Sequence, residues 1–443
     1  MSIDFRLHKS ILKIAVPSIL ANITIPLVGL VDMAIAGHIT SAWAIGGIAV
    51  GTMLFDLLYG CFGFLRVSTA GLTAQAYGAN NPQECGSLFV RSSAIAVAGA
   101  LVIWLLQWVY LEAVLSVMPC SQEVASFARA YFNIRIWAAP ATLMLMTCKG
   151  WFIGMQDGTR AMVADLVVNG VNMLASYLLA VHTPLGAIGV AWGTLIAQWT
   201  GLIVALTMIA ARYSASFQFS PVIFHFDRRF FRLNADLFVR SLCFIVVYVG
   251  WTAICSGYGD VELAASSLMM KLFMLFSFFI DGFAYAGEAL VGKTIGEQQA
   301  QQSAVSAQPS DHLIKVLFAW GAGVGLFFSV LYALFPDTLF ASLTTDAGVV
   351  ATMHRYIGWL IAMPVVSMLA FMWDGIYAGA TRGKEIRNAM LWAAAAFAGV
   401  YVLITLDSRL STFIGMHALY AAYFAHLAAR VIYLSFRYNI RKS

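Results

Sequence analysis

The chain has 443 residues, of which 61% are hydrophobic and 11% are charged, and its formal net charge is +5. Soluble globular proteins are about 45–50% apolar and about 25% charged, so this composition excludes an ordinary soluble domain and favours a protein with a lipid-facing surface. The basic residues do not form tracts interleaved with aromatic residues, so we expect no nucleic-acid partner.

A membrane-spanning helix needs about 20 mostly apolar residues, and the chain contains twelve runs of this kind. Their centres lie near Thr24, Leu54, Ala100, Leu143, Val171, Ile203, Val246, Phe276, Gly325, Val366, Ala396 and Ala422. The runs are continuous rather than alternating, unlike the strands of an outer-membrane barrel. The expected fold class is therefore an all-α polytopic membrane protein with twelve transmembrane helices in two homologous six-helix lobes.

The longest polar interruption, residues 212–234, lies near the midpoint of the chain. We therefore expect an N-terminal six-helix lobe over residues 1–213, a cytoplasmic linker over 214–234 and a C-terminal six-helix lobe over 235–443. The halves also repeat each other in sequence. Tyr131, Pro140, Gly150 and Gly154 recur as Tyr356, Pro364, Gly375 and Gly379, and Gly78 recurs as Gly296. With six spans each, these are parallel repeats, as in transporters whose two halves rock.

Lysine and arginine gather in alternate loops, beginning with Arg6, Lys9 and Lys13 before the first span. Loops on the other side, such as 111–125 and 336–353, contain neither residue. Cytoplasmic loops carry the excess of basic residues. We therefore expect a multi-pass protein of the plasma (inner) membrane with both termini in the cytoplasm.

Asp32 lies in the first span, within the segment PLVGLVDMAIAGH. A charged side chain at membrane depth costs about 3 kcal/mol on insertion scales, and no Lys or Arg lies within one or two helical turns. Burial without a cationic partner favours the protonated form of a carboxyl group. We predict that Asp32 couples transport to protons; the alternative is a permanently protonated residue that only holds helices together. Pro17 and Pro26 in the same span can bend it, or merely shape it.

Further polar residues follow helical spacing in the fifth and sixth spans. Asn169, Asn172 and Ser176 are spaced i, i+3, i+7, and Thr194 and Gln198 are spaced i, i+4. Each set lies on one helical face. Together with Asp32 they could form a polar cavity in the N-terminal half, or serve as hydrogen bonds between helices.

The second half has its own charges at membrane depth, namely Asp281, Glu288 and Asp374, with Arg66 and Arg240 as opposite charges that could pair with them. Asp281 and Glu288 are seven residues apart, which places them on one helical face. Structural ion pairs and a functional binding site are both consistent with this set.

Motifs of enzymes are absent from the sequence: there is no Walker A, H-E-x-x-H or G-x-S-x-G pattern. The 8 histidines have no metal-ligand spacing and the 6 cysteines form no C-x-x-C pair. We therefore expect no enzymatic activity, no metal and no cofactor. Transport would be driven by an ion gradient, with the transported ion a proton or alternatively sodium.

Several segments together resemble the multidrug and toxic compound extrusion (MATE) family: PLVGLVDMAIAGH, GLTAQAYGANN and GWFIGMQDGTR. DGFAYAGEALVG and DGIYAGATR are similar to its bacterial DinF branch. The resemblance covers essentially the whole chain. It implies two six-helix lobes arranged as a V around a central cavity. It also implies export of organic, often cationic and amphipathic compounds, coupled to inward flow of protons or sodium, and usually protons in this branch.

Within this resemblance, Asp32 matches the first-helix aspartate proposed as the protonation site, and Pro17 matches a proline at which the first helix bends in some members. Asn172 and Thr194 match residues of the same polar network. Family members commonly carry a second aspartate four residues after the asparagine, where this chain has Ser176. A single carboxylate weakens a sodium site and makes proton coupling through Asp32 the simpler interpretation. Asp374 matches a tenth-helix aspartate implicated in cation binding in another branch.

We therefore expect a monomeric secondary exporter that works by alternating access, with the lipid bilayer and small organic substrates as its partners. Substrate would lie against apolar side chains such as those of Met33, Met269, Met270 and Phe273. The rivals are a sodium-coupled exporter, a flippase for a lipid-linked substrate, which would need a cationic cavity, and a membrane-embedded transferase, which would need clustered His or Asp residues.

Overall fold

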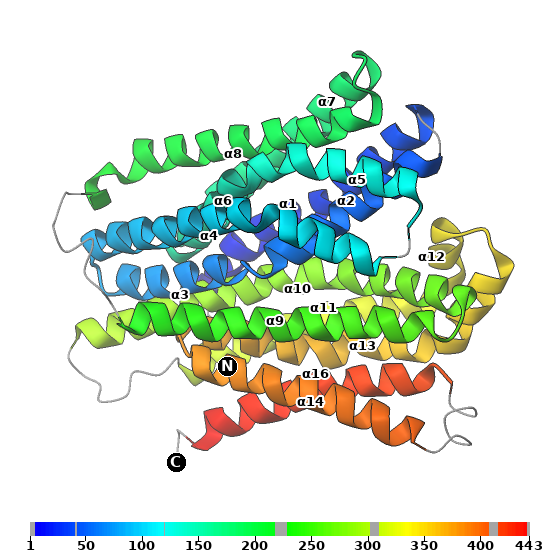
Figure 1. Cartoon of the computed structure of the whole chain (residues 1–443). Helices are drawn as coiled ribbons and strands as arrows, with labels where there is room; N and C mark the ends of the chain where they lie inside the picture. Colours follow the sequence, from blue (N-terminus) through cyan, green and yellow to red (C-terminus); the bar gives the residue numbers. More distant parts are fainter. Residues whose placement is uncertain are drawn as a thin grey trace. The chain divides into compact units, whose positions relative to one another are not determined.

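The computed structural model describes residues 5–39, 42–118, 120–217, 228–301, 310–406 and 415–440, and all regular secondary structure in these ranges is helical. In the first half the helices are α1 (Phe5–Ile39), α2 (Ala42–Gly60), α3 (Phe64–Gly78), α4 (Pro82–Val117), α5 (Gln122–Arg135), α6 (Ala139–Gly154), α7 (Gly158–Val181) and α8 (Gly189–Tyr213), with 3-10 helices η1 (Ile136–Ala138), η2 (Gly186–Ile188) and η3 (Ser214–Phe217) (Figure 1). In the second half they are α9 (Arg228–Ser256), α10 (Asp260–Ala300), α11 (Asp311–Leu334), α12 (Pro336–Leu343), α13 (Ala347–Gly379), α14 (Gly383–Thr405) and α16 (His417–Ile440).

Among the described residues, 12 helical segments are long and apolar enough to cross a membrane. Some combine two labelled helices, since α2 with α3 gives Gly46–Gly78 and α5 with α6 gives Gln122–Gly154. Every predicted centre falls inside one of these segments. Large apolar side chains also face outward, such as Leu105 of α4 at 78% exposure, which suits lipid and not water. The predicted all-α fold with twelve transmembrane helices is confirmed.

The described chain divides into two compact units. The N-terminal unit comprises Val16–Arg228 and Gly292–Ala307, and the C-terminal unit comprises Met1–Ala15, Arg229–Val291 and Gln308–Ser443. Most of each predicted lobe falls in one unit, but the beginning of α1 belongs to the C-terminal unit and the end of α10 to the N-terminal unit. Within the predicted linker, residues 214–217 form η3, residues 218–227 lie outside the described ranges, and α9 begins at residue 228.

Polar side chains fix the beginnings of several helices. Asn81 accepts a hydrogen bond from the Glu84 amide at 3.0 Å at the start of α4, and Asp346 accepts from the Gly348 and Val349 amides at 2.8 and 3.1 Å at the start of α13. Such caps satisfy the amides that have no partner in the first helical turn. The caps therefore satisfy some of the first-turn amides of α4 and α13.

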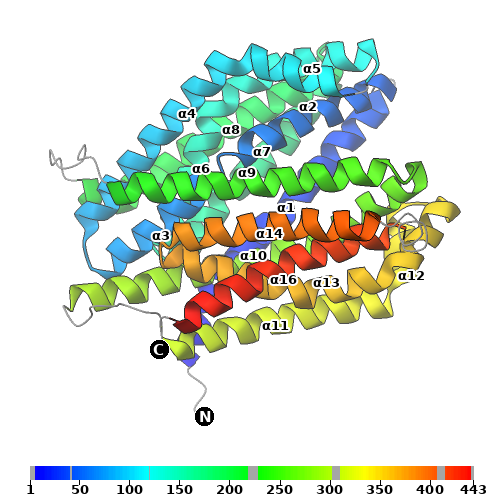
Figure 2. The ribbon, with the colours of Figure 1, turned by 60° about the horizontal axis from the view of Figure 1, so that its bottom comes forward.

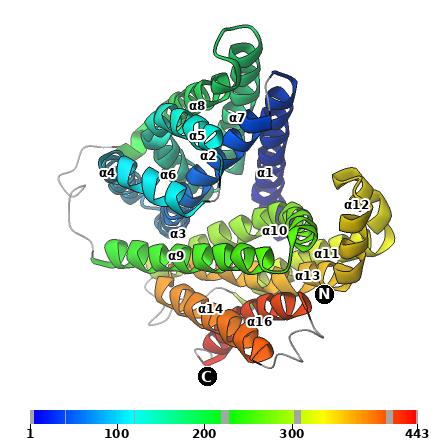
Figure 3. The same ribbon diagram turned by 45° about the vertical axis from the view of Figure 1, so that its right-hand side comes forward.

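Small residues allow close packing of α7 against α8, which run side by side in the N-terminal unit (Figures 1 and 3). Gly189 and Gly193 are four residues apart and face α7. A Cβ atom at Gly193 would lie 2.4 Å from the Ser176 hydroxyl, and one at Gly189 would lie 2.7 Å from the Ala180 amide nitrogen. In membranes, helices associate largely through such close backbone approach. α14 and α16 form the corresponding close pair in the C-terminal unit (Figure 2).

The internal repeat is visible in the packing of its glycines. A Cβ atom at Gly150 of α6 would lie 2.3 Å from the carbonyl oxygen of Arg66 in α3. At the equivalent Gly375 of α13, a Cβ atom would lie 2.3 Å from the carbonyl oxygen of Ala284 in α10. The two units therefore use the same backbone contact at the same repeat position.

The ends of α3 and α10 cross at a second pair of repeated glycines. A Cβ atom at Gly78 would lie 2.0 Å from the Lys293 carbonyl oxygen, and one at Gly296 would lie 2.0 Å from the Gln75 carbonyl oxygen. All four residues belong to the N-terminal unit. Only glycine fits such a crossing without displacement of the backbone.

Candidate functional site

Polar side chains of the N-terminal unit meet along one face of α7. Asn172 donates a hydrogen bond from Nδ2 to Thr194 Oγ1 of α8 at 2.9 Å. The Thr194 hydroxyl donates in turn to the Val190 carbonyl at 3.1 Å. One turn earlier on α7, Asn169 Nδ2 donates to Thr24 Oγ1 of α1 at 2.5 Å. This face of α7 therefore ties that helix both to α8 and to α1.

Asp32 of α1 lies beside this face. Its side chain is half-buried, and its Oδ1 atom makes no hydrogen bond within the described chain. The Ser176 side chain of α7 faces the Asp32 carboxyl group, yet Ser176 Oγ and Asn172 Oδ1 also lack hydrogen-bond partners among the described residues. Buried polar atoms are nearly always hydrogen-bonded. Three oxygens without partners therefore mark an arrangement that can take up a proton or a small cation.

Arg135, the last residue of α5, is the basic residue whose charge acts on Asp32. Its guanidinium carbon lies 4.7 Å from the centre of the Phe55 ring of α2, and its Nη1 donates to the Tyr131 hydroxyl at 3.1 Å. These contacts hold the cation inside the N-terminal unit. Among the described residues no basic side chain forms an ion pair with Asp32, as the sequence indicated. Arg135, which comes from the fourth span, acts on it only from a longer distance.

A second carboxylate shares this cation. Asp56 of α2 lies in the field of Arg135 as Asp32 does, although its side chain is exposed. Asp32 is thus not the sole acidic group of this region. The signal for Asp56 is present in the sequence in the same form as for Asp32, one acidic residue within an apolar stretch, AVGTMLFDLLYG. We refer to Asp32, Asp56 and Arg135, with Asn172 and Ser176, as the N-terminal site.

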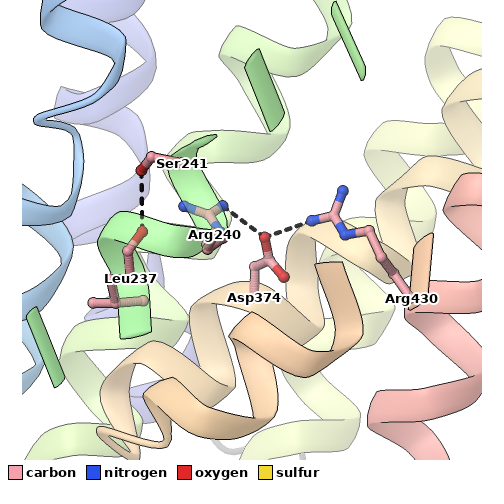
Figure 4. Close-up of polar contacts among 5 residues, drawn as sticks. All are labelled: Leu237, Arg240, Ser241, Asp374 and Arg430. Atoms are coloured by element: carbon pink, nitrogen blue, oxygen red, sulfur yellow. Dashed lines mark hydrogen bonds and ion pairs between the residues drawn. The ribbon is translucent and has the colours of Figure 1, made fainter. Parts of the chain in front are cut away.

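Three charged side chains meet inside the C-terminal unit (Figure 4). Arg240 Nη2 of α9 donates to Asp374 Oδ2 of α13 at 2.8 Å, and Arg430 Nη2 of α16 donates to the same oxygen at 2.5 Å. The sequence left open whether Arg240 pairs with an acid of the second half or belongs to a binding site, and here it pairs with Asp374. The sequence did not indicate Arg430. These three residues, the C-terminal cluster, carry two positive charges and one negative charge.

Comparison with known proteins agrees with this architecture. The MatE family model matches the chain twice, over residues 17–178 and 237–405, which together make up more than half of its length. The chain belongs to the MatE family. One match in each half also accords with the internal repeat that the glycines display.

Relatives of this MatE protein are transporters. It is 33% identical over 437 residues to DNA damage-inducible protein F of Escherichia coli (strain K12), covering 96% of the chain and 91% of that relative. It is 24% identical over 380 residues to multidrug and toxin extrusion protein 1 of Homo sapiens, covering 85% of the chain and 65% of that relative. A solved structure described as the outward-facing conformation of a multidrug resistance MATE family transporter of the MOP superfamily superposes with a TM-score of 0.85 at 15% identity, covering 99% of this chain and 97% of that one. The resemblance drawn from the motifs is confirmed, and the protein is a transporter rather than an enzyme.

The other charges predicted at membrane depth in this MatE chain lie in different places. Asp281 and Glu288 both lie in α10, and Glu288 is buried at 1% exposure. Arg66, which was grouped with the acids of the C-terminal half, lies in α3 of the N-terminal unit, whereas Arg240 of α9 pairs with Asp374. The assignment of Arg66 to the C-terminal lobe is therefore wrong, because depth in the membrane does not show which unit contains a residue. Its pairing with those acids stays a prediction.

Two further predictions concern the N-terminal site. α1 runs as one helix through Pro17 and Pro26, and the proposal that these prolines bend it on protonation stays a prediction. Gln198 of α8 is half-buried one turn after Thr194 and has no hydrogen bond to Asn172 in the described structure. Its place in the polar network also stays a prediction.

Some residues expected to contact substrate are packed in the C-terminal unit. Met269 and Phe273 are 2% and 6% exposed. Met269 Sδ accepts a hydrogen bond from the Tyr420 hydroxyl at 3.3 Å, and the Phe273 ring meets the Tyr423 ring at 6.1 Å. In this conformation both stabilise the interior of the unit. Of the other two expected residues, Met270 is half-buried, and the side chain of Met33 lies outside the described part of the structure.

Proposed function

We propose that this MatE transporter exports organic compounds of cationic or amphipathic character in exchange for protons that bind at Asp32. The protein would act as a monomer in the plasma (inner) membrane, with both termini in the cytoplasm, and would work by alternating access. The sequence similarity to a multidrug and toxin extrusion protein supports organic compounds of this kind as substrates. The alternation of basic and non-basic loops supports the orientation.

The observation that carries the proposal is the surroundings of the Asp32 carboxyl group. When ionised, Asp32 shares the charge of Arg135 with Asp56. The Ser176 hydroxyl can donate to the ionised carboxylate. When protonated, Asp32 no longer competes for Arg135 and becomes a donor itself, for example to Ser176 Oγ. Protonation therefore removes a long-range attraction and reverses the direction of the hydrogen bond between Asp32 of α1 and Ser176 of α7.

This rearrangement of contacts offers a route from proton binding to a change in shape. Helix α1 is also joined to α7 through the hydrogen bond from Asn169 to Thr24. A movement of α1 toward α7 at Asp32 would act on a helix that contains two prolines, and proline removes a backbone hydrogen bond and weakens the helix locally. We propose that this movement is the step that couples proton entry to substrate release.

The experiment is transport of ethidium in proteoliposomes under an imposed pH gradient. Asp32→Asn should abolish gradient-driven transport, because the amide cannot bind and release a proton. The matched control is Asp346→Asn, the same substitution at an exposed helix cap where the amide oxygen can still accept the two backbone hydrogen bonds. Asp346→Asn should transport as the wild type does. Gradient-driven transport by Asp32→Asn at the wild-type rate would refute the coupling role.

Sodium coupling is the second candidate, and the oxygens without partners favour it. Asp32 Oδ1, Asn172 Oδ1 and Ser176 Oγ are the hard oxygen ligands that small cations prefer. The same proteoliposomes separate the two ions: a sodium gradient at equal pH should drive no transport if the proton is the coupling ion. Transport driven by sodium alone and lost in Asp32→Asn would assign the site to sodium instead.

A further inference from the structure

The C-terminal cluster has one positive charge more than it neutralises internally. Arg240 and Arg430 both donate to Oδ2 of Asp374 (Figure 4). The side chains of Asp374 and Arg430 are 17% and 7% exposed, so the cluster lies within the unit rather than on its surface. A charge at membrane depth is unfavourable unless it is compensated. The surplus positive charge therefore favours the binding of a further anion.

Most of the hydrogen-bonding capacity of the two arginines is unused. Each guanidinium carries five N–H donors in a planar fork, and the hydrogen bonds to Asp374 use one donor from each. Arg240 Nε is buried and has no partner among the described residues. Arginine suits bidentate binding of carboxylate and phosphate groups. The two guanidiniums thus present donors for such a group beside Asp374.

The adjacent carboxylate of the same unit is already engaged. Asp236 lies one turn before Arg240 on α9, but its Oδ1 accepts a hydrogen bond from Arg387 Nη1 of α14 at 2.5 Å. Asp374 itself needs one arginine for neutrality. Among the described residues, the carboxylate bonded to the cluster therefore balances one of its arginines and leaves the other without a counter-charge.

Aromatic residues precede Arg430 on α16. Tyr423, His426 and Arg430 are spaced i, i+3, i+7, so they share one face of the helix. The rings of Tyr423 and His426 stack at 5.8 Å with an interplanar angle of 17°. The Tyr423 ring also meets the Trp251 ring at 5.3 Å. Arginine beside aromatic rings suits a ligand that has an anionic group attached to an apolar part: the arginine binds the anionic group and the rings contact the apolar part.

We propose that Arg240 and Arg430 bind a carboxylate group carried by an amphipathic substrate of this transporter. The inference rests on the proposed export function and adds to it a substrate class, apolar compounds with an anionic group. The ligand carboxylate takes the N–H donors that Asp374 leaves unused and approaches past Arg240, the more accessible arginine at 25% side-chain exposure. Asp374 holds the two guanidiniums together and competes with the ligand for them.

The test measures binding to the full-length protein in lipid nanodiscs with no ion gradient. The probe is dansyl-labelled undecanoic acid, compared with its uncharged primary amide. Wild type should bind the acid about tenfold more tightly than the amide, the effect of a charge-assisted hydrogen bond. Arg430→Gln should lower the affinity for the acid about tenfold and leave the affinity for the amide unchanged. This variant keeps Arg240 and Asp374 as a balanced pair, so it should fold.

Two further variants sharpen the result. Asp374→Asn removes the competing carboxylate, so it should bind the acid more tightly than wild type, and the acid should raise its melting temperature more than that of wild type. A purely structural ion pair predicts no such gain. Arg129→Gln is the control, because it removes an arginine from an exposed pair with Glu112. It should leave both affinities unchanged.

Equal binding of the acid and the amide by wild type would overturn the proposal, as would an equal loss of both in Arg430→Gln. A lipid phosphate is the other source of an oxyanion. If Arg430→Gln slows flipping of fluorescent phosphatidylglycerol in vesicles and leaves acid binding unchanged, the carboxylate proposal also fails. Because binding is measured without a gradient, the result is separate from proton coupling. Asp32→Asn should lose driven transport and keep the preference for the acid.

Discussion

The N-terminal site and the C-terminal cluster have opposite charges. In the N-terminal site one cation, Arg135, serves two carboxylates. In the C-terminal cluster one carboxylate, Asp374, serves two arginines. Each unit thus combines one charge with two charges of the opposite sign. The surplus is negative in the first unit and positive in the second, which suits proton or cation uptake in one and an anionic group in the other.

The contrast shows which features the internal repeat preserves. Gly150 and Gly375 make the same contact with a carbonyl oxygen in the two units, at Arg66 and at Ala284. The backbone contact is therefore shared, while the side chains at the contacted positions differ in charge. Helix packing in membranes restricts the residues at close contacts and leaves inward-facing polar positions free to take different roles.

The largest effect is expected from removing Arg135, the charge that both carboxylates of the N-terminal site share. Arg135→Gln removes the positive charge near both carboxylates, the hydrogen bond to the Tyr131 hydroxyl and the contact with the Phe55 ring. It should lower the free energy of unfolding by about 3 kcal/mol, the sum expected for a charge-assisted hydrogen bond and a cation–π contact. Asp56→Asn removes one of two like charges, leaves Arg135 with Asp32, and should cost less than about 1 kcal/mol. Denaturant unfolding in detergent micelles measures both variants.

The double variant tests whether the two acids share this cation. If they do, Arg135→Gln should be less destabilising in the background of Asp56→Asn, because one stranded carboxylate has been removed. A double-mutant cycle gives the interaction energy. Strictly additive losses of stability would mean that Asp56 and Arg135 do not interact. The N-terminal site would then no longer have one cation shared by two carboxylates, and the comparison with the C-terminal cluster would fail.

The next largest loss of stability is expected at the glycine contact that both units share. Gly150→Ala and Gly375→Ala should each cost about 2 kcal/mol, because a Cβ atom in either place lies 2.3 Å from a carbonyl oxygen and forces the helices apart. Gly170→Ala and Gly323→Ala are matched controls, one in each unit, where a Cβ atom meets nothing within 4 Å. They should be neutral or stabilising, since alanine favours helix. Unequal losses at Gly150 and Gly375 would show that the repeat does not extend to packing strength.

The sequence predicted the spans because membrane crossing depends on the apolar length of a local segment. It also predicted the repeat, because the close helix contacts require glycine at the same positions of both halves, and these positions can be compared in the sequence. The single acidic residue of an apolar run drew attention to Asp32, and the same rule would have found Asp56. These features can be found from the sequence because each depends on a few neighbouring residues.

The partners of the charges were not predictable in this way. Arg240 and Arg430 are 134 and 56 residues from Asp374 along the chain, and they reach it from two other helices of the same unit, α9 and α16. Arg135 is the last residue of α5, a helix with many polar residues. Nothing in the neighbouring sequence therefore indicated that Arg135 acts on Asp32. Helical periodicity orders side chains around one helix and does not state which helix lies opposite.

The smallest effect tests whether charge or neutral hydrogen bonding holds the N-terminal site together. Thr194→Val keeps the shape of the side chain but leaves Asn172 Nδ2 without its acceptor, and should cost about 1 kcal/mol, as for other hydrogen bonds between membrane helices. Thr207→Val on the exposed side of α8 removes a hydroxyl that bonds to its own helix at Val204, and should cost less in the same unfolding assay. A loss in Thr194→Val as large as in Arg135→Gln would mean that the hydrogen bond from α7 to α8, rather than the shared cation, determines the stability of this site. The opposite charges of the two units would then affect ligand binding and would not determine the stability of the fold.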